Sequence, residues 1–152
     1  MDALKLRAVS SSEPAVAALI QTHFDLMRAS SPEESCHVMQ ADALSGLFML
    51  GAEASGALLS IGALAQIAPQ HGEIKSMHTT AAARGKGAAR LILRSLLDEA
   101  KRLKLTTVSL ETGSADLFAP ARALYASEGF NDCPPFGSYT LDPNSVFMTK
   151  AI

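Results

Sequence analysis

The stretch Ala83-Arg84-Gly85-Lys86-Gly87-Ala88-Ala89 joins a segment of alternating apolar and polar residues, 73–80, to a long amphipathic segment, 87–104. The first segment has the period of a β-strand, and the second places its apolar residues at the spacing of one helix face. The stretch is therefore predicted to be a turn from a strand into a helix. Its glycines permit backbone angles that other residues avoid, and the alanines that follow keep the start of the helix narrow.

A turn of this composition is suited to binding phosphate. The first N–H groups of a helix lack intrahelical partners and carry a partial positive charge, so anions bind there when side chains do not obstruct them. Arg84, Lys86 and Arg90 add positive charge. On the glycines alone, a phosphate site and a plain strand-to-helix connection are equally open.

Two common nucleotide motifs do not fit this turn. A P-loop would need glycine where the chain has Thr80, and serine or threonine where it has Gly87. A dinucleotide fingerprint would need glycine at Arg90 and normally opens the first strand–helix–strand unit, whereas an apolar hairpin precedes the turn here. The hypothesis of a small nucleotide-binding module is therefore disfavoured. Binding of ATP or NAD would restore this hypothesis.

The rest of the chain predicts further strands and helices. Two apolar runs, 46–51 and 56–64, are joined by a short glycine-bearing link, which is typical of an antiparallel hairpin. The other expected strands are 4–9, 106–112, a short one from Phe130, and 145–150. The other expected helices are 15–27, a short piece at 33–40, and one that holds Pro120 in its first turn and stops at Gly129.

The composition is that of one globular domain. The chain has 152 residues, of which 48% are hydrophobic and 18% charged, so 1–152 is taken as a single domain. Its two cysteines are too few for a disulfide scaffold, and no apolar run approaches the roughly 20 residues of a membrane helix. A net charge of -2 gives no broad reason to bind nucleic acid. We therefore expect a cytoplasmic protein with neither a membrane nor a nucleic-acid partner.

Two motifs together favour the phosphate site over the plain connection. Arg-x-x-Gly-x-Ala, at 84–89, resembles the acetyl-CoA signature of the GNAT acetyltransferase superfamily. Ala-x-x-Leu-Tyr-x-x-x-Gly-Phe, at 121–130, resembles the downstream motif of the same family, and the expected order of strands and helices agrees over nearly the whole chain. Within the superfamily, the segments 72–77 and 143–148 resemble small, poorly specified bacterial-type acetyltransferases.

The resemblance implies an α/β fold: a mixed, mostly antiparallel sheet, flanked by helices and splayed into a V between strands 73–80 and 106–112. Acetyl-CoA would lie in the V as co-substrate. Its pantetheine would pair with the main chain of three residues, and its pyrophosphate would lie on the turn. These cofactor residues would be Met77, His78, Thr79, Arg84, Gly85, Lys86, Gly87, Ala88 and Ala89. The family often has asparagine where this chain has Phe118, so the side-chain contact of that asparagine is not carried over.

Amine acetylation requires a proton acceptor for the amine and a proton donor for the leaving thiolate. An alkylamine of pKa about 10 is only about one part in a thousand neutral at pH 7, so the acceptor matters. Glu73 resembles the acidic residue that many relatives place on this strand, and Glu111 lies on the facing strand; each is a candidate base or an exposed charge. Tyr125 occupies the position whose hydroxyl faces the acetyl-CoA sulfur in the family, or else is a core aromatic.

The acceptor side of the reaction has weaker signals. Tyr139 and Phe136, in the loop before the last strand, are candidates for the acceptor pocket or for hairpin packing. His71 and His78 have no recognisable partner, and no spacing of histidine or cysteine residues indicates a metal site.

These observations predict a direct acetyl transfer, without an acyl-enzyme, from acetyl-CoA to a primary amine of a small molecule or peptide. The alternative is an acyl-CoA-binding sensor or a catalytically inactive GNAT-like domain. Dimers are common in the family, which leaves a homodimer open.

Overall fold

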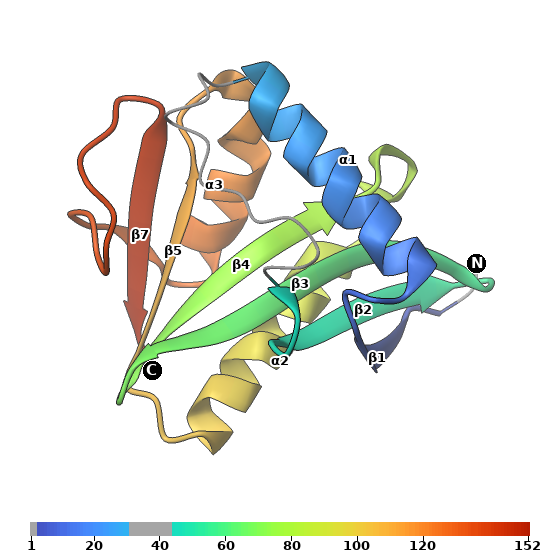
Figure 1. Ribbon diagram of the computed structural model, residues 1–152, viewed down its shortest axis with the longest axis horizontal. Coiled ribbons are helices and arrows are strands. Elements are labelled where there is room, and N and C mark those ends of the chain that lie inside the picture. The colour runs from blue at the N-terminus through green and yellow to red at the C-terminus, as the bar shows by residue number, and fades with distance from the viewer. Residues whose placement is uncertain (1–2, 31–43) are drawn as a thin grey trace.

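The computed structural model describes residues 3–30 and 44–152, and Figure 1 shows its ribbon. The helical piece expected at 33–40 lies outside these residues. The strands are β1 (Lys5–Val9), β2 (Phe48–Ala54), β3 (Ala57–Ala68), β4 (His71–Thr79), β5 (Thr107–Gly113), β6 (Asn131–Asp132) and β7 (Ser145–Ala151). The α-helices are α1 (Pro14–Ser30), α2 (Ala88–Arg102) and α3 (Ala119–Ser127), and 3-10 turns occupy Ala81–Ala83 and Asp116–Phe118.

The described strands form one seven-stranded sheet in the order β1-β2-β3-β4-β5-β7-β6. Every neighbouring pair is antiparallel except β4 and β5, which run parallel. The predicted hairpin forms β2 and β3, and β3 continues to Ala68 because a two-residue turn, Pro69–Gln70, leads straight into β4. The predicted mixed, mostly antiparallel sheet is confirmed.

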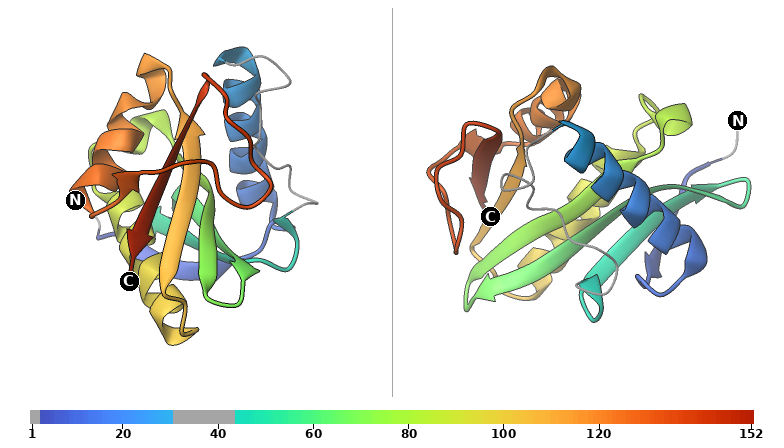
Figure 2. Two further views of the ribbon diagram at one scale, coloured as in Figure 1. Left: turned by 90° about the vertical axis from the view of Figure 1, so that its left-hand side faces the viewer. Right: turned by 45° about the horizontal axis from the view of Figure 1, so that its top comes forward.

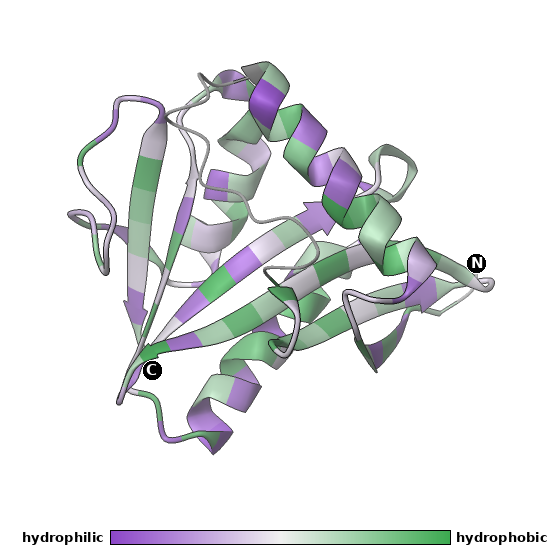
Figure 3. Cartoon of the chain, viewed as in Figure 1, coloured by the Kyte–Doolittle hydropathy of each residue, from purple (hydrophilic) through white to green (hydrophobic). Residues whose placement is uncertain are grey.

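The helices cover both faces of the sheet. Figure 2 shows the strands between α1 on one side and α2 with α3 on the other. α1 packs through Val16 and Ile20 against Met49 and Ile61, whereas α2 belongs to the larger core that also contains Tyr125. Figure 3 shows hydrophobic and hydrophilic bands along α2. The amphipathic pattern of the sequence is thus used to bury one face of that helix.

The sheet opens between its two parallel strands. β4 and β5 pair only along His71–Ile74 and Thr107–Leu110, and beyond these residues they diverge, as Figure 1 shows. On its other edge β4 carries a bulge, because Ile61 pairs with His78 but Ala63 pairs with Lys75. Ser76, in the bulge, has a φ of 55°, an uncommon value for a residue with a side chain. The predicted V between these strands is confirmed.

A glycine opposite the bulge allows the chain to pack there. A Cβ atom added to Gly62 would meet the Met77 sulfur and would lie 2.8 Å from Ile92 Cγ2 on α2. Contacts this short do not occur between real carbon atoms. Gly62 therefore fixes how closely the bulge and α2 approach β3.

We expect Gly62→Ala to lower the free energy of unfolding by roughly 1–3 kcal/mol, because the added methyl overpacks this contact. Urea denaturation measures the loss. If Met77 causes the clash, Gly62→Ala with Met77→Ala will lose less stability than the sum of the two single variants. Ala57→Ser, at the exposed start of β3, is the control and should change the stability by less than about 0.5 kcal/mol. Unchanged stability of Gly62→Ala would contradict this account.

Candidate active site

Two adjoining cavities lie along the V. The larger has a volume of about 430 Å³ and the smaller about 80 Å³. Both are lined by His23, Met77, Phe118, Ala121 and Tyr125. These shared residues mark the junction, where the two cavities adjoin.

The glycine turn forms one end of the larger cavity. Gly85 and Gly87 have φ values of 79° and 84°, and a Cβ at either position would meet nothing within 4 Å. Gly87 is the N-cap of α2, and no side chain caps the helix. The first N–H groups of α2 therefore remain available to an anion.

The predicted cofactor residues gather at this cavity with one exception. Its lining includes Met77, His78, Thr79, Arg84, Gly85, Gly87, Ala88 and Ala89. Lys86 is not among the lining residues, and its side chain is exposed.

Arg90 forms an ion pair within the protein. Arg90 Nη1 donates to a Glu128 carboxylate oxygen at 2.6 Å and to Ser127 Oγ at 3.0 Å, and Arg94 Nε donates to the other Glu128 oxygen at 2.6 Å. Arg90 lines the cavity, and its ion pair with Glu128 also links α2 to the end of α3. Because two arginines share one carboxylate, Glu128 offsets only part of their positive charge, and Arg84 adds further positive charge to this wall.

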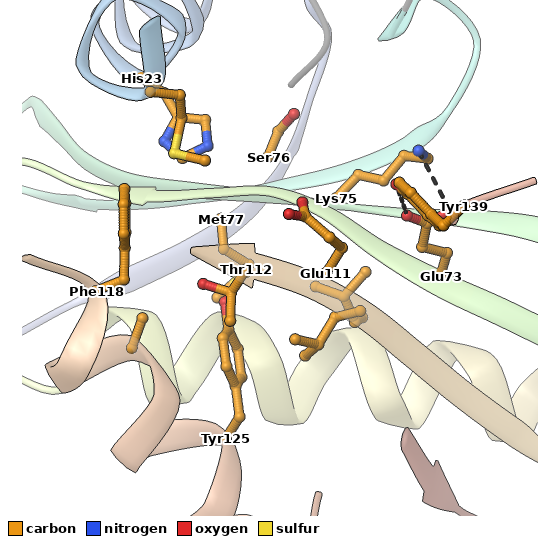
Figure 4. A pocket seen from close by; sticks show the side chains of 14 residues that line it. His23, Glu73, Lys75, Ser76, Met77, Glu111, Thr112, Phe118, Tyr125 and Tyr139 are labelled. Carbon is orange, nitrogen blue, oxygen red and sulfur yellow. Dashed lines mark hydrogen bonds and ion pairs between the residues drawn. The ribbon is translucent and has the colours of Figure 1, made fainter. Parts of the chain in front are cut away.

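Tyr125 lies at the junction of the cavities. It is 6% exposed, and its ring meets Phe130 edge-on at a centroid distance of 6.0 Å. Burial raises the pKa of the hydroxyl, so this group stays protonated and can donate a hydrogen bond. In Figure 4 the side chain rises from α3 toward Thr112. Tyr125 is thus a core aromatic that also lines both cavities, and its role at the acetyl-CoA sulfur stays a prediction.

The smaller cavity contains a buried ionic network. Glu73 is 4% exposed, which rules out the exposed strand-end charge considered for it. The Tyr139 hydroxyl donates to Glu73 Oε2 at 2.6 Å, and Lys75 Nζ lies 3.3 Å from Glu73 Oε1, as the dashed lines in Figure 4 mark. Both oxygens of Glu73 therefore already have partners.

Glu111 is the other carboxylate of this cavity. Burial raises its pKa to about 7, and the nearby charge of Glu73 contributes to the shift. A carboxyl group with this pKa exchanges a proton easily near neutral pH. Glu111 is therefore a better proton acceptor than a glutamate with an ordinary pKa.

The two predicted acceptor residues have different positions. Tyr139 lines the smaller cavity, whereas Phe136 lines neither cavity. Phe136 packs behind Tyr139, with ring centroids 5.2 Å from Tyr139, 5.7 Å from His71 and 6.0 Å from Phe147. Phe136 is thus a packing residue that supports the loop carrying Tyr139.

The comparisons with known proteins agree with this geometry. The model of the acetyltransferase (GNAT) family matches residues 16–130. The uncharacterised N-acetyltransferase YsnE of Bacillus subtilis is 42% identical over 139 residues, which cover 90% of this chain and 92% of that protein. The chain belongs to the GNAT acetyltransferase family.

Solved structures share the fold of this GNAT chain. A Klebsiella pneumoniae protein assigned as an acyl-CoA N-acyltransferase has a TM-score of 0.80 at 23% identity, over 97% of both chains. The Salmonella typhimurium protein YncA, solved with its cofactor acetyl-CoA, has a TM-score of 0.72 at 21% identity, over 99% of this chain and 94% of that one.

Family membership defines the activity class of the protein. It is an acyl-CoA-dependent N-acyltransferase, and GNAT enzymes use acetyl-CoA as co-substrate and act on amines. None of the helices within the described ranges is both long and apolar enough to cross a membrane.

The GNAT motifs give no indication of His23, which reaches the junction from α1. Its Nδ1 lies 3.2 Å from Nδ1 of His78, so the expectation that His78 has no partner is wrong. Burial, with a smaller effect of His78, lowers the pKa of His23 to about 4. Burial also lowers the pKa of His78. The two rings are thus neutral at pH 7, one donating and the other accepting.

A spacing signal for His23 was present in the sequence. Val16, Ile20 and Met27 are buried on one face of α1, and His23 falls on the same face, three residues after Ile20 and four before Met27. A polar residue inside an apolar stripe indicates a partner or a site.

We expect Glu111→Gln to stabilise this acetyltransferase at pH 8 but much less at pH 4.5. The folded pKa of about 7 lies above the value of about 4.3 expected in the unfolded chain. As the pH rises between these values, the unfolded chain loses its proton before the folded one, so the wild type loses stability. The neutral amide avoids this loss, and the gain at pH 8 should reach roughly 2–4 kcal/mol.

Thermal and urea unfolding at both pH values measure this effect. Glu99→Gln is the matched control, because Glu99 is paired with Arg102 and its pKa is lowered by that hydrogen bond. It should give no stabilisation at pH 8. Equal stability of Glu111→Gln and wild type at pH 8 would show that Glu111 is not held in an unfavourable ionised state.

Proposed function

We propose that the protein transfers the acetyl group of acetyl-CoA directly to a primary amine, with acetyl-CoA in the larger cavity and the amine in the smaller one. The observation that carries the proposal is the junction of the two cavities at Tyr125, with the glycine turn on one side and Glu111 on the other. Acetyl-CoA, which is anionic at its pyrophosphate, fits the environment of the glycine turn. An amine, which is cationic before the reaction, fits the environment of Glu111.

The larger cavity has the features that acetyl-CoA requires. The open N–H groups at the start of α2 and the Arg84 side chain suit the pyrophosphate. Beyond Ile74, β4 has no pairing partner on the side of β5, so main-chain groups at Met77–Thr79 can accept pantetheine much as a sheet edge accepts a strand.

The smaller cavity has the features that amine chemistry requires. The amine nitrogen attacks the thioester carbonyl carbon, the C–S bond breaks, and the amine proton passes to the Glu111 carboxylate. Tyr125 donates its hydroxyl proton to the leaving sulfur, which yields the acetylated amine and free CoA thiol. Glu73 is assigned a supporting role, because Tyr139 and Lys75 already occupy its oxygens.

Direct transfer is favoured over an acyl-enzyme. Cys133, the cysteine within the described part of the chain, lines neither cavity, and burial raises the pKa of its thiol. A thiol held in this state is a poor nucleophile.

Acetyl-CoA should raise the melting temperature of the protein, whereas ATP and NAD should not. At a concentration 100 times the dissociation constant, the expected stabilisation is about 2.7 kcal/mol. Arg84→Ala should weaken acetyl-CoA binding, because Arg84 lines the larger cavity. Arg94→Ala is the matched control, since Arg94 is paired with Glu128 and lines neither cavity. Protection by ATP or NAD without protection by acetyl-CoA would refute the proposal.

Glu111→Gln should reduce acetylation of an amine by about 100-fold or more, and Tyr125→Phe by about 10-fold or more, with acetyl-CoA binding retained in both. In the wild type, kcat/KM should rise as the pH increases through about 7, because Glu111 must be ionised to accept a proton. Release of free CoA thiol measures turnover. Tight acetyl-CoA binding with no turnover on any amine would instead favour a sensor.

A further inference from the structure

The smaller cavity is not uniformly acidic. Glu73 and Glu111 line it, but so does Lys75, whose side chain is 19% exposed. Of the described residues that line this cavity, Lys75 is the one lysine or arginine. A cation in a site that accepts amines is unexpected, because it repels the ammonium form of the acceptor.

Lys75 is held at the cavity wall by an ion pair that leaves part of the hydrogen-bonding capacity of its ammonium group open. Its Nζ lies 3.3 Å from Glu73 Oε1, which leaves further N–H donors of the ammonium group. The other Glu73 oxygen accepts the Tyr139 hydroxyl at 2.6 Å, so the carboxylate is fixed from both sides. Glu73 and Tyr139 therefore position Lys75, while an anion can still reach its remaining donors.

Ser76 adds a second donor beside Lys75. It lines the same cavity, and its φ of 55° arises in the bulge of β4. Figure 4 shows the Ser76 hydroxyl and the Lys75 ammonium extending from the same side of this strand. Uncommon backbone angles of this kind cluster at ligand sites, where the surrounding structure maintains them.

Lys75 and Glu111 face one cavity without touching. The charge of Lys75 acts on the Glu111 carboxyl, yet the two described residues form no ion pair within 4.0 Å. The cavity wall therefore carries the Lys75 ammonium, paired with Glu73, and separately the Glu111 carboxylate. A molecule that has both a carboxylate and an amine can match these two groups. The small volume, about 80 Å³, favours a molecule whose amine and carboxylate lie close together.

We infer that the acceptor is a small aminocarboxylate, whose amine approaches Glu111 and whose carboxylate binds Lys75 and Ser76. This inference rests on the proposed function, since it names the substrate class of the same site. The apolar wall formed by Met27 and Phe118 remains for the side chain of the acceptor. A diamine would instead place its second ammonium against Lys75.

The test uses the full-length protein with acetyl-CoA and measures CoA thiol release for matched acceptors. One set is L-alanine, L-alanine amide and ethylamine, and another is L-leucine, L-leucine amide and 3-methylbutylamine. The free acids should exceed their amides and carboxylate-free amines by roughly 10- to 100-fold in kcat/KM, the range of one charge-assisted hydrogen bond. The amide has the less basic amine and hence the larger neutral fraction at pH 7, so amine basicity opposes a preference for the acid over the amide. The simple amines are more basic than the amino acids, so the ratio of acid to amide is the deciding comparison.

Variants of the cation provide the second arm. In Lys75→Gln the ratio of acid to amide should fall toward one, and in Lys75→Arg it should persist. Lys101→Gln, an exposed lysine of α2 that lines neither cavity, is the control and should keep the wild-type ratio. An unchanged ratio in Lys75→Gln would overturn the assignment of Lys75.

The remaining outcomes separate this inference from the proposed function. Equal or better turnover of amides and simple amines by the wild type overturns the aminocarboxylate and leaves amine acetylation standing. Absence of turnover with every free amino acid in the twenty-member set also overturns it. Failure of acetyl-CoA to raise the melting temperature refutes the proposed function itself.

Discussion

The short pairing between β4 and β5 is the constraint on which the rest of the site depends. Parallel strands normally continue side by side, but these two separate after Ile74 and Leu110. On the edge of β4 that pairs with β3, the bulge at Ser76 interrupts the pairing. Gly62 of β3 leaves room there for Met77 and for α2 to pack closely. Main-chain groups without a strand partner must bind water or a ligand. The separation therefore creates the cavities and leaves the chain ready to bind in them.

Much of the fold and of the cofactor end could be predicted from the sequence, because local rules govern both. The turn at 83–89 needs positive φ angles where glycine stands, and Pro120 lies in the first turn of α3 as its φ requires. The bulge could not be predicted in the same way. Ser76 has no local preference for a φ of 55°, and the bulge that contains it is defined by the register between β3 and β4, where Gly62 makes room for Met77.

The parts of the site that sequence reasoning missed depend on residues far apart in the chain. Arg90 is paired with Glu128, 38 residues later, and this partner cannot be assigned from the turn alone. His23 and His78 are separated by 55 residues and meet only because α1 crosses the sheet above β4. The aromatic contact that makes Phe136 a support residue likewise requires the loop to fold back onto β7. Each of these contacts joins residues that are far apart in the chain, and none of them reflects an error in the type of a helix or strand.

The electrostatic arrangement along the V differs from one end to the other. Arg84 and the open start of α2 make the far end of the larger cavity positive, whereas Glu73, Glu111 and Lys75 make the smaller cavity polar and charged. Between them, the His23 and His78 rings and the Tyr125 hydroxyl are all neutral at pH 7. A neutral junction suits the attack of an uncharged amine on an uncharged thioester, because a fixed charge there would favour the ammonium or repel it. The burial that makes Glu111 costly to ionise also raises its pKa into the range suited to proton transfer, so stability and reactivity at the site oppose each other.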